Sequence, residues 1–166
     1  MPIVLLDSNP LSLISNPVNQ GEPFRCRNRI KQLVSNNIPV IVPEIIDYEL
    51  RRKLIYDKRN KSIERLDRLA QEMGVIYAPI TTEVMRKASA LWDWARATGQ
   101  STAHENKIDI DVILAAQSII LAMETEEYVI IATPNIKDLR RYSVDAQEWN
   151  NITVEYCLNP NPQKLI

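Results

Sequence analysis

The chain has 166 residues, of which 45% are hydrophobic and 25% charged, a balance that excludes a disordered or collagen-like chain and suits a single domain over residues 1–166. Its formal net charge of -1 excludes attraction to nucleic acid through a bulk positive charge. A nucleic-acid role would therefore need a local basic rim around an acidic centre.

The N-terminal part of the chain predicts two strands separated by a helix. Residues 3–6 (IVLL) are apolar throughout, as in a strand buried on both faces of a parallel sheet, and a polar turn over 7–10 ends the run. A helix is expected over 22–36, with a proline in its first turn, followed by an apolar strand over 38–42. No basic segment precedes a long apolar run, so we expect no signal peptide, no membrane association and a cytoplasmic location.

The middle of the chain is predicted to be mainly helical. Pro43 and Glu44 begin a helix with a partial apolar stripe that extends to residue 59. Another helix is expected over 62–73, capped by Ser62 and ended by a glycine, and a third strand over 75–78. A long amphipathic helix over 81–98 and a polar loop over 100–107 follow.

The last third continues the alternation of helices and strands. Residues 109–123 are apolar on nearly every side, which predicts a deeply buried helix. A fourth strand is expected over 128–133, a short helix or turn over 136–142 and an edge strand over 152–156. Strands that alternate with helices indicate an α/β fold with a parallel sheet covered on both faces.

Polar side chains recur where the predicted strands end. Asp7 directly follows the first strand, Glu44 follows the second, and Thr133, Asn135 and Asp138 follow the fourth. Ligands of open α/β sheets bind at the carboxyl ends of the strands. The sequence therefore predicts a polar site at this edge of the sheet.

Three further carboxylates lie on predicted helices. Asp109 and Asp111 begin an otherwise apolar helix, where a buried carboxylate is costly unless it is paired or binds a metal ion. The two point in different directions, so Asp109 alternatively caps the helix, and Asp111 alternatively only complements the helix dipole. Glu49 lies in mid-helix, where pairing with the three cations that follow it is the alternative to a role in the site.

Residues for other catalytic chemistries are few. Cys26 and Cys157 are far apart and outside any metal-binding spacing, which indicates two reduced thiols. The only histidine, His104, lies in a polar segment without the local signature of a zinc site or a catalytic triad.

Four segments, in order over residues 3–139, together resemble the PIN-domain family, in particular the VapC-type ribonuclease toxins of bacterial toxin–antitoxin pairs. VLLDSNPL resembles the family's strand followed by Asp-(Thr/Ser)-Asn, and IPVIVPEIIDYELRRKL resembles its second strand and Glu-Leu helix. DIDVILAAQSIIL resembles the Asp-x-x-(Ile/Leu)-x-Ala helix. VIIATPNIKDL resembles the last strand with its Thr-x-(Asp/Asn)-x-x-Asp-(Phe/Leu) motif.

The resemblance implies a three-layer α/β/α sandwich with a short, mostly parallel sheet, and an acidic pocket that binds Mg²⁺ or Mn²⁺ and hydrolyses RNA. It makes Asp7, Glu49 and Asp111 the catalytic residues. The implied metal ligands are Asp7, Glu49, Asp109, Asp111, Asn135 and Asp138, with Ser8 and Thr133 in support. The family often has Asp where this chain has Asn135, whose carbonyl can bind a metal ion but brings no charge.

The resemblance also implies partners. They are an RNA substrate, a small antitoxin protein of a type II pair and a possible homodimer. RNA contacts are expected from Arg51, Arg52, Lys53, Lys137 and Arg140, for which a solvated helix face is the alternative explanation. The alternative function, kept open by Asn135, is an RNA-binding or scaffold module of PIN type with a degenerate, non-catalytic metal site.

Overall fold

The structure is a computed structural model that describes residues 1–100, 104 and 109–161. Most of the polar loop expected over 100–107 and the end of the chain after residue 161 lie outside the described residues.

One sheet of five parallel strands lies at the centre of the molecule, in the order β3-β2-β1-β4-β5. The strands are β1 Ile3–Leu6, β2 Val40–Pro43, β3 Ile76–Ala78, β4 Val129–Ala132 and β5 Asp145–Gln147. β1 pairs with β2 on one side and with β4 on the other. β1, β2 and β4 are buried along their whole length, which agrees with their uninterrupted apolar sequences.

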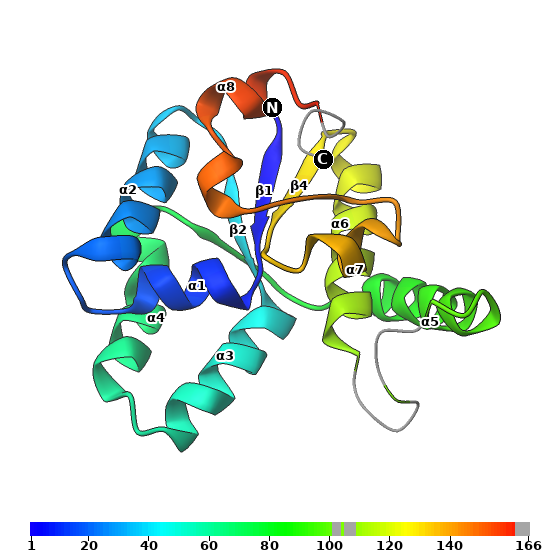
Figure 1. Cartoon of the computed structure of the whole chain (residues 1–166), viewed down its shortest axis with the longest axis horizontal. Helices are drawn as coiled ribbons and strands as arrows, with labels where there is room; N and C mark the ends of the chain where they lie inside the picture. Colours follow the sequence, from blue (N-terminus) through cyan, green and yellow to red (C-terminus); the bar gives the residue numbers. More distant parts are fainter. Residues whose placement is uncertain (101–103, 105–108, 162–166) are drawn as a thin grey trace.

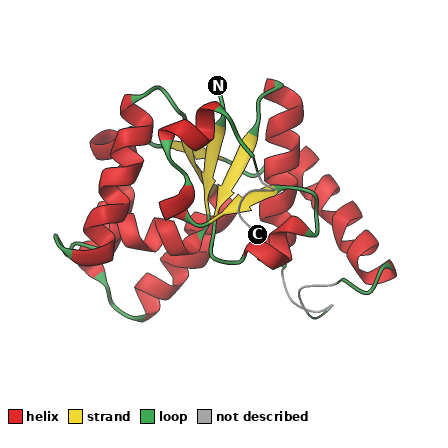
Figure 2. Ribbon diagram, turned by 45° about the horizontal axis from the view of Figure 1, so that its top comes forward, coloured by secondary structure: helices red, strands yellow, loops and turns green. Residues whose placement is uncertain are grey.

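Helices cover both faces of the sheet, so the fold is the expected three-layer α/β/α sandwich (Figures 1 and 2). The α-helices are α1 Ser8–Ser15, α2 Gly21–Ser35, α3 Glu44–Tyr56, α4 Asn60–Met73, α5 Thr82–Ala97, α6 Ile110–Thr125, α7 Ile136–Arg140 and α8 Val154–Leu158. A 3-10 turn, η1, covers Trp149–Asn151. In Figure 1, α1 to α4 lie on one side of the sheet and α5 to α7 on the other.

The prediction of a polar turn over 7–10 is wrong, because helix α1 begins there at Ser8. Asp7 is the N-cap of α1, and its Oδ1 accepts a hydrogen bond from the Ser8 N–H at 2.6 Å. A cap on the first residue after β1 lets the chain pass from strand to helix without a loop. Helix α4 likewise begins earlier than expected, at Asn60, so Ser62 lies inside it and is not its cap.

The prediction of an edge strand over 152–156 is also wrong. Residues 154–158 form α8, because Thr153 Oγ1 accepts a hydrogen bond from the Tyr156 N–H at 3.0 Å and caps a helix. The edge strand beside β4 is instead β5, which carries buried Asp145 and Gln147 and therefore has no apolar pattern.

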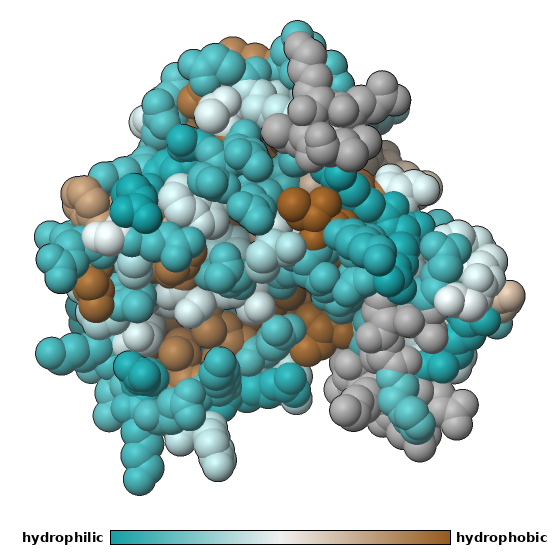
Figure 3. Space-filling view, in the orientation of Figure 1, coloured by the Kyte–Doolittle hydropathy of each residue, from teal (hydrophilic) through white to brown (hydrophobic). Residues whose placement is uncertain are grey.

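Helix α6 is deeply buried only in its first half. Residues 112–118 are buried, whereas Met123 near its C-terminal end is 68% exposed. Figure 3 shows a mainly hydrophilic surface with separate hydrophobic patches. Within the part of the chain that the structure describes, no helix is long and apolar enough to cross a membrane.

Candidate active site

The sheet places Asp7 beside Thr133. Leu6 of β1 pairs with Ala132 of β4, so the residues that follow these strands are neighbours. Thr133 Oγ1 donates to Asp7 Oδ2 at 2.6 Å, while the Ser8 N–H holds Asp7 Oδ1. The Asp7 carboxylate is buried and held at both oxygens, at the positive N-terminal end of α1.

Asp111 and Asn135 extend this network. The Asn135 N–H donates to Thr133 Oγ1 at 2.9 Å, and its Nδ2 donates to Asp111 Oδ2 at 2.9 Å. Asp109 caps α6, because its Oδ1 accepts from the Val112 N–H at 3.1 Å. The capping alternative for Asp109 is therefore confirmed, while Asp111, in the first turn of α6, faces Asn135 and the site.

Glu49 approaches from α3 and is half-buried. Burial raises the pKa of Glu49 above its ordinary value, and the nearby charge of Asp7 raises it further. The Ser8 side chain, by hydrogen bonding, and Arg52, by its positive charge, act in the opposite direction. Glu49 thus faces the start of α1, which is the placement that the sequence motifs predicted.

These side chains line one open cleft of about 400 Å³. Its polar lining residues are Asp7, Ser8, Asn9, Glu49, Arg52, Asp109, Asp111 and Asn135. Acids from α3, α6 and the end of β1 therefore meet although they lie far apart in the sequence.

The cleft is strongly acidic. Burial, followed by the charges of Asp7, Asp109, Asp138 and Glu49, raises the pKa of Asp111 to about 7. Mutual repulsion of this kind is relieved by a proton or by a bound cation.

Carboxylate and amide oxygens are the donors that hard divalent cations prefer, so the chemistry of this set fits Mg²⁺ or Mn²⁺. Among the described residues, no three acidic, histidine or cysteine side chains are already arranged as a metal-binding group. The Asn135 amide and the Thr133 hydroxyl both donate to carboxylate oxygens that a cation would share.

Several predicted residues lie outside the cleft or are engaged elsewhere. Asp138 forms an ion pair with Arg141 at 2.7 Å. Arg51 is paired with Asp47 and Asp67, each at 2.7 Å.

Three of the other cations that were predicted to contact RNA also lie outside the cleft. Arg140 donates to the Ala146 carbonyl at 3.1 Å, Lys53 lines a neighbouring groove and Lys137 is exposed. Of the five cations expected to contact RNA, only Arg52 lines the cleft.

Asn9 is a lining residue that the sequence analysis did not single out. It borders the acidic cleft and two adjoining hollows. The sequence feature that could have identified Asn9 is its position as the third residue of the Asp-Ser-Asn motif after β1.

Other nucleophiles are poorly suited to catalysis. Burial raises the pKa of Cys26 to about 12 and that of Cys157 to about 11, so both are thiols at neutral pH. His104 is exposed and is not among the residues that line the cleft.

No family model matches the sequence, and no curated protein matches it. The structure is similar to VapBC2 from Rickettsia felis, bound to a DNA fragment from their promoter, with a TM-score of 0.64 and 15% identity over 89% of this chain and 98% of that chain. VapBC-1 from nontypeable Haemophilus influenzae matches with a TM-score of 0.62 and 17% identity, over 89% of this chain and 98% of that one. FitAcB from Neisseria gonorrhoeae matches with a TM-score of 0.60 and 20% identity, over 90% and 99% of the two chains.

The chain has a VapC-like PIN-domain fold. The family resemblance read from the four sequence segments is thereby confirmed for the fold. In this VapC-like fold the acidic cleft lies where the central strands β1 and β4 end, as expected of a parallel α/β sheet.

Proposed function

We propose that the chain is a metal-dependent endoribonuclease and the toxin of a type II toxin–antitoxin pair. The observation that carries the proposal is the convergence of Asp7, Glu49, Asp109 and Asp111 on one cleft. The raised pKa of Asp111, about 7, indicates a site with more negative charge than its surroundings neutralise. The similarity to the solved VapBC and FitAcB structures supports the toxin assignment.

Five residues of the cleft would have a direct role in this reaction. A bound Mg²⁺ or Mn²⁺ would supply an activated water and offset the charge that develops at phosphorus. Asp7, Glu49 and Asp111 would hold the cation, and Asn135 would add an uncharged oxygen. Arg52 at the wall of the cleft would attract the phosphate.

Two supporting residues orient the carboxylates. Thr133 fixes one oxygen of Asp7 by its hydroxyl, and the Ser8 side chain lies close enough to Glu49 to lower the pKa of that carboxyl. Partners that orient metal ligands affect activity nearly as much as the ligands themselves. Asp109 would act mainly as the cap that positions Asp111.

A small antitoxin protein is the proposed partner. A polar groove of about 470 Å³ between α1, α3 and α4 opens beside Asn9 and Glu49 and offers such a partner a route to the cleft. A homodimer remains a prediction that rests on the family resemblance.

Cleavage of single-stranded RNA by the purified chain tests the proposal. With Mg²⁺ or Mn²⁺ the wild-type chain should cut RNA, and a chelator should stop it. Asp7→Asn should lower the rate by more than roughly a hundredfold, since loss of even an outer partner of a metal site costs about 10- to 100-fold. Asp93→Asn, at an exposed acid on α5, is the matched control and should cut normally. Equal cleavage by Asp7→Asn and wild type would overturn the proposal.

The alternative function, an RNA-binding or scaffold module, also has an observation in its favour. Asn135 stands where an acid is common, and its amide donates to Asp111 where a cation would otherwise bind. Such a module would bind RNA without cutting it and would take up Mn²⁺ poorly.

A further inference from the structure

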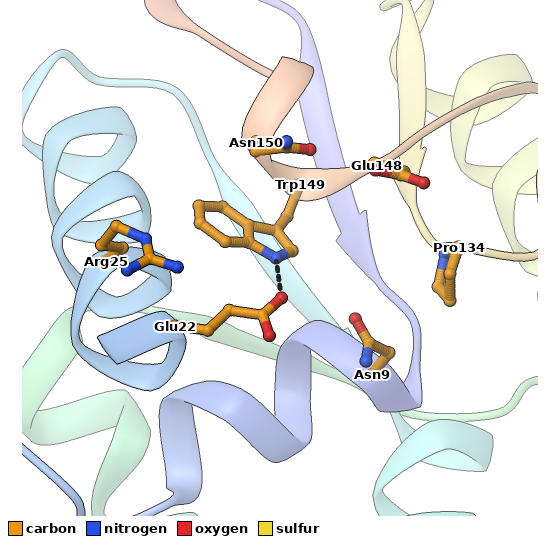
Figure 4. A pocket seen from close by; sticks show the side chains of 7 residues that line it. All are labelled: Asn9, Glu22, Arg25, Pro134, Glu148, Trp149 and Asn150. Carbon is orange, nitrogen blue, oxygen red and sulfur yellow. Dashed lines mark hydrogen bonds between the residues drawn. The ribbon is translucent and has the colours of Figure 1, made fainter. Parts of the chain in front are cut away.

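A second hollow, here called the Trp149 pocket, lies beside the acidic cleft and has no part in the reaction proposed above. It has a volume of about 310 Å³, in the range of small-ligand sites. It is lined by Asn9, Glu22, Arg25, Pro134, Glu148, Trp149 and Asn150. Figure 4 shows the Trp149 ring beside the Arg25 guanidinium, with Asn9 and Pro134 toward the other side of the hollow.

Trp149 is held in place before any ligand binds. Its ring is half-buried against the core, and its Nε1 donates to Glu22 Oε1 at 3.4 Å. Arg29 of α2 donates to the carbonyls of Asn150 and Ile152 at 2.9 and 3.0 Å, which ties the 3-10 turn to the helix. A fixed aromatic ring loses little entropy on contact and is a good stacking surface.

The polar lining favours a nucleobase over a phosphate. The carboxylates of Glu22 and Glu148 only accept hydrogen bonds, so they repel phosphate and match the N–H donors on a base edge. The amides of Asn9 and Asn150 can both donate and accept. The exposed Arg25 guanidinium is suited to stacking on a base or to contact with the adjoining backbone.

The Trp149 pocket is continuous with the acidic cleft. Asn9, which follows β1, and Pro134, which follows β4, line both hollows. A strand with a phosphodiester over Asp7 would therefore bring a neighbouring base to Trp149.

We propose that the Trp149 pocket binds one unpaired base of the RNA strand whose phosphodiester lies over the acidic cleft. This inference rests on the proposed RNA cleavage. The base stacks on Trp149, and guanine is preferred because its N1–H and N2–H groups can donate together to one carboxylate, Glu22 or Glu148. Uracil has a single N–H donor on that edge and binds less tightly. The pocket thus makes cleavage selective for sequence.

The test measures binding separately from cleavage, with the full chain carrying Asp7→Asn throughout. Short fluorescein-labelled oligouridine RNAs contain one guanosine, one inosine or neither, and binding is followed by fluorescence anisotropy. Inosine lacks only the N2 amino group of guanosine. The variants are Trp149→Ala, Trp149→Phe, Glu22→Gln and Glu148→Gln, with Trp94→Ala as the matched control, since Trp94 is 40% exposed on α5 and is not a lining residue of the pocket.

The guanosine RNA should bind most tightly to the Asp7→Asn chain. Trp149→Ala should weaken its binding roughly tenfold or more, as expected when base stacking is lost, and Trp149→Phe should keep most of it. Glu22→Gln or Glu148→Gln should reduce the preference for guanosine over inosine without weakening binding of plain oligouridine. Trp94→Ala should bind like its parent.

Equal binding by Trp149→Ala and Trp94→Ala would overturn the inference, and so would equal affinity of the Asp7→Asn chain for all three RNAs. Should Trp149→Ala fail to fold, the base preference decides the matter: an unchanged preference for guanosine over inosine in both Glu22→Gln and Glu148→Gln would overturn the inference. Failure of the wild-type chain to cut any RNA is a different result, which would overturn the proposed function and not the base preference.

Discussion

Asp111 is the residue whose environment most clearly separates this cleft from an ordinary polar surface. Four carboxylates raise its pKa in addition to burial, while its neighbour Asn135 contributes one hydrogen bond. The folded chain without metal therefore binds a proton at Asp111 near neutral pH, which an unfolded chain does not.

This titration predicts how stability and metal binding depend on pH. The folded-state pKa of Asp111, about 7, lies above its ordinary value of 3.8, so the folded state binds more protons between these values. Stability of the metal-free chain should therefore fall as pH rises from about 4 to about 7, and Asp111→Asn should flatten this dependence. Thermal melts at a series of pH values check the slope. Because Mn²⁺ competes with the proton, the rise in Tm on adding Mn²⁺ should be larger at pH 8 than at pH 6. A slope unchanged in Asp111→Asn would contradict the assignment.

Asp109 and Asp111 should behave differently when each is changed to the amide. Asp109→Asn keeps a side-chain oxygen that can cap α6, so it should lower RNA cleavage by less than about tenfold. Asp111→Asn removes a carboxylate that would hold the proposed cation and should lower cleavage by more than roughly a hundredfold. Initial rates at saturating RNA compare the two. Similar losses in both variants would make Asp109 a metal ligand and not chiefly a cap.

The strand β5 is held in the sheet by polar contacts as well as by its pairing with β4. The buried carboxylate of Asp145 accepts hydrogen bonds from the hydroxyls of Tyr128 and Tyr156, at 2.8 and 2.7 Å, and from Gln147 Nε2 at 2.8 Å. These donors replace the water that would otherwise surround the carboxylate. Without them, burial of Asp145 in the sheet would be strongly unfavourable.

Removal of one donor should destabilise this edge of the sheet. Tyr156→Phe should lower the free energy of unfolding by about 1.5–3 kcal/mol, the usual worth of a hydrogen bond to a charged group. Tyr56→Phe, at a ring that is 86% exposed at the end of α3, is the control and should change it little. Chemical denaturation measures the free energy of unfolding of both variants and of the wild-type chain. A change below about 0.5 kcal/mol in Tyr156→Phe would show that Asp145 does not need this partner.

The same strand shows where sequence patterns stop being informative about elements. β1, β2 and β4 were predictable because their residues are apolar on both faces of the sheet. β5 was not, since its buried Asp145 accepts hydrogen bonds from the hydroxyls of Tyr128 and Tyr156, which only the folded chain brings near. The segment that contains Thr153 looked like a strand, yet its hydroxyl caps α8.

For the molecule as a whole, the order of the motifs predicted that Asp7, Glu49 and Asp111 lie near one another, but not that Asp138 is absent from the cleft lining and pairs with Arg141. Asp7 and Thr133 follow neighbouring central strands, and Glu49 and Asp111 lie on helices that begin near them, so order and motif were enough. The ion pair of Arg51 with Asp67 and the contact between Trp149 and Glu22, 127 positions apart, arise from packing and have no local signature.

The whole-chain charge of -1 conceals a strong local imbalance. Acids gather in the cleft, and most of the predicted RNA-binding cations lie elsewhere or are paired. RNA would therefore approach a site that repels phosphate until a divalent cation is bound. Metal binding is thus the step on which the proposed activity depends.

Calorimetric titration of Mn²⁺ into the purified chain at pH 8 tests this claim most directly. The wild-type chain should show saturable binding, and Asp111→Asn should weaken it at least tenfold, with Asp93→Asn as a control that binds like wild type. Absence of saturable heat in the wild-type chain, or equal affinity in Asp111→Asn, would contradict a catalytic metal site in the acidic cleft.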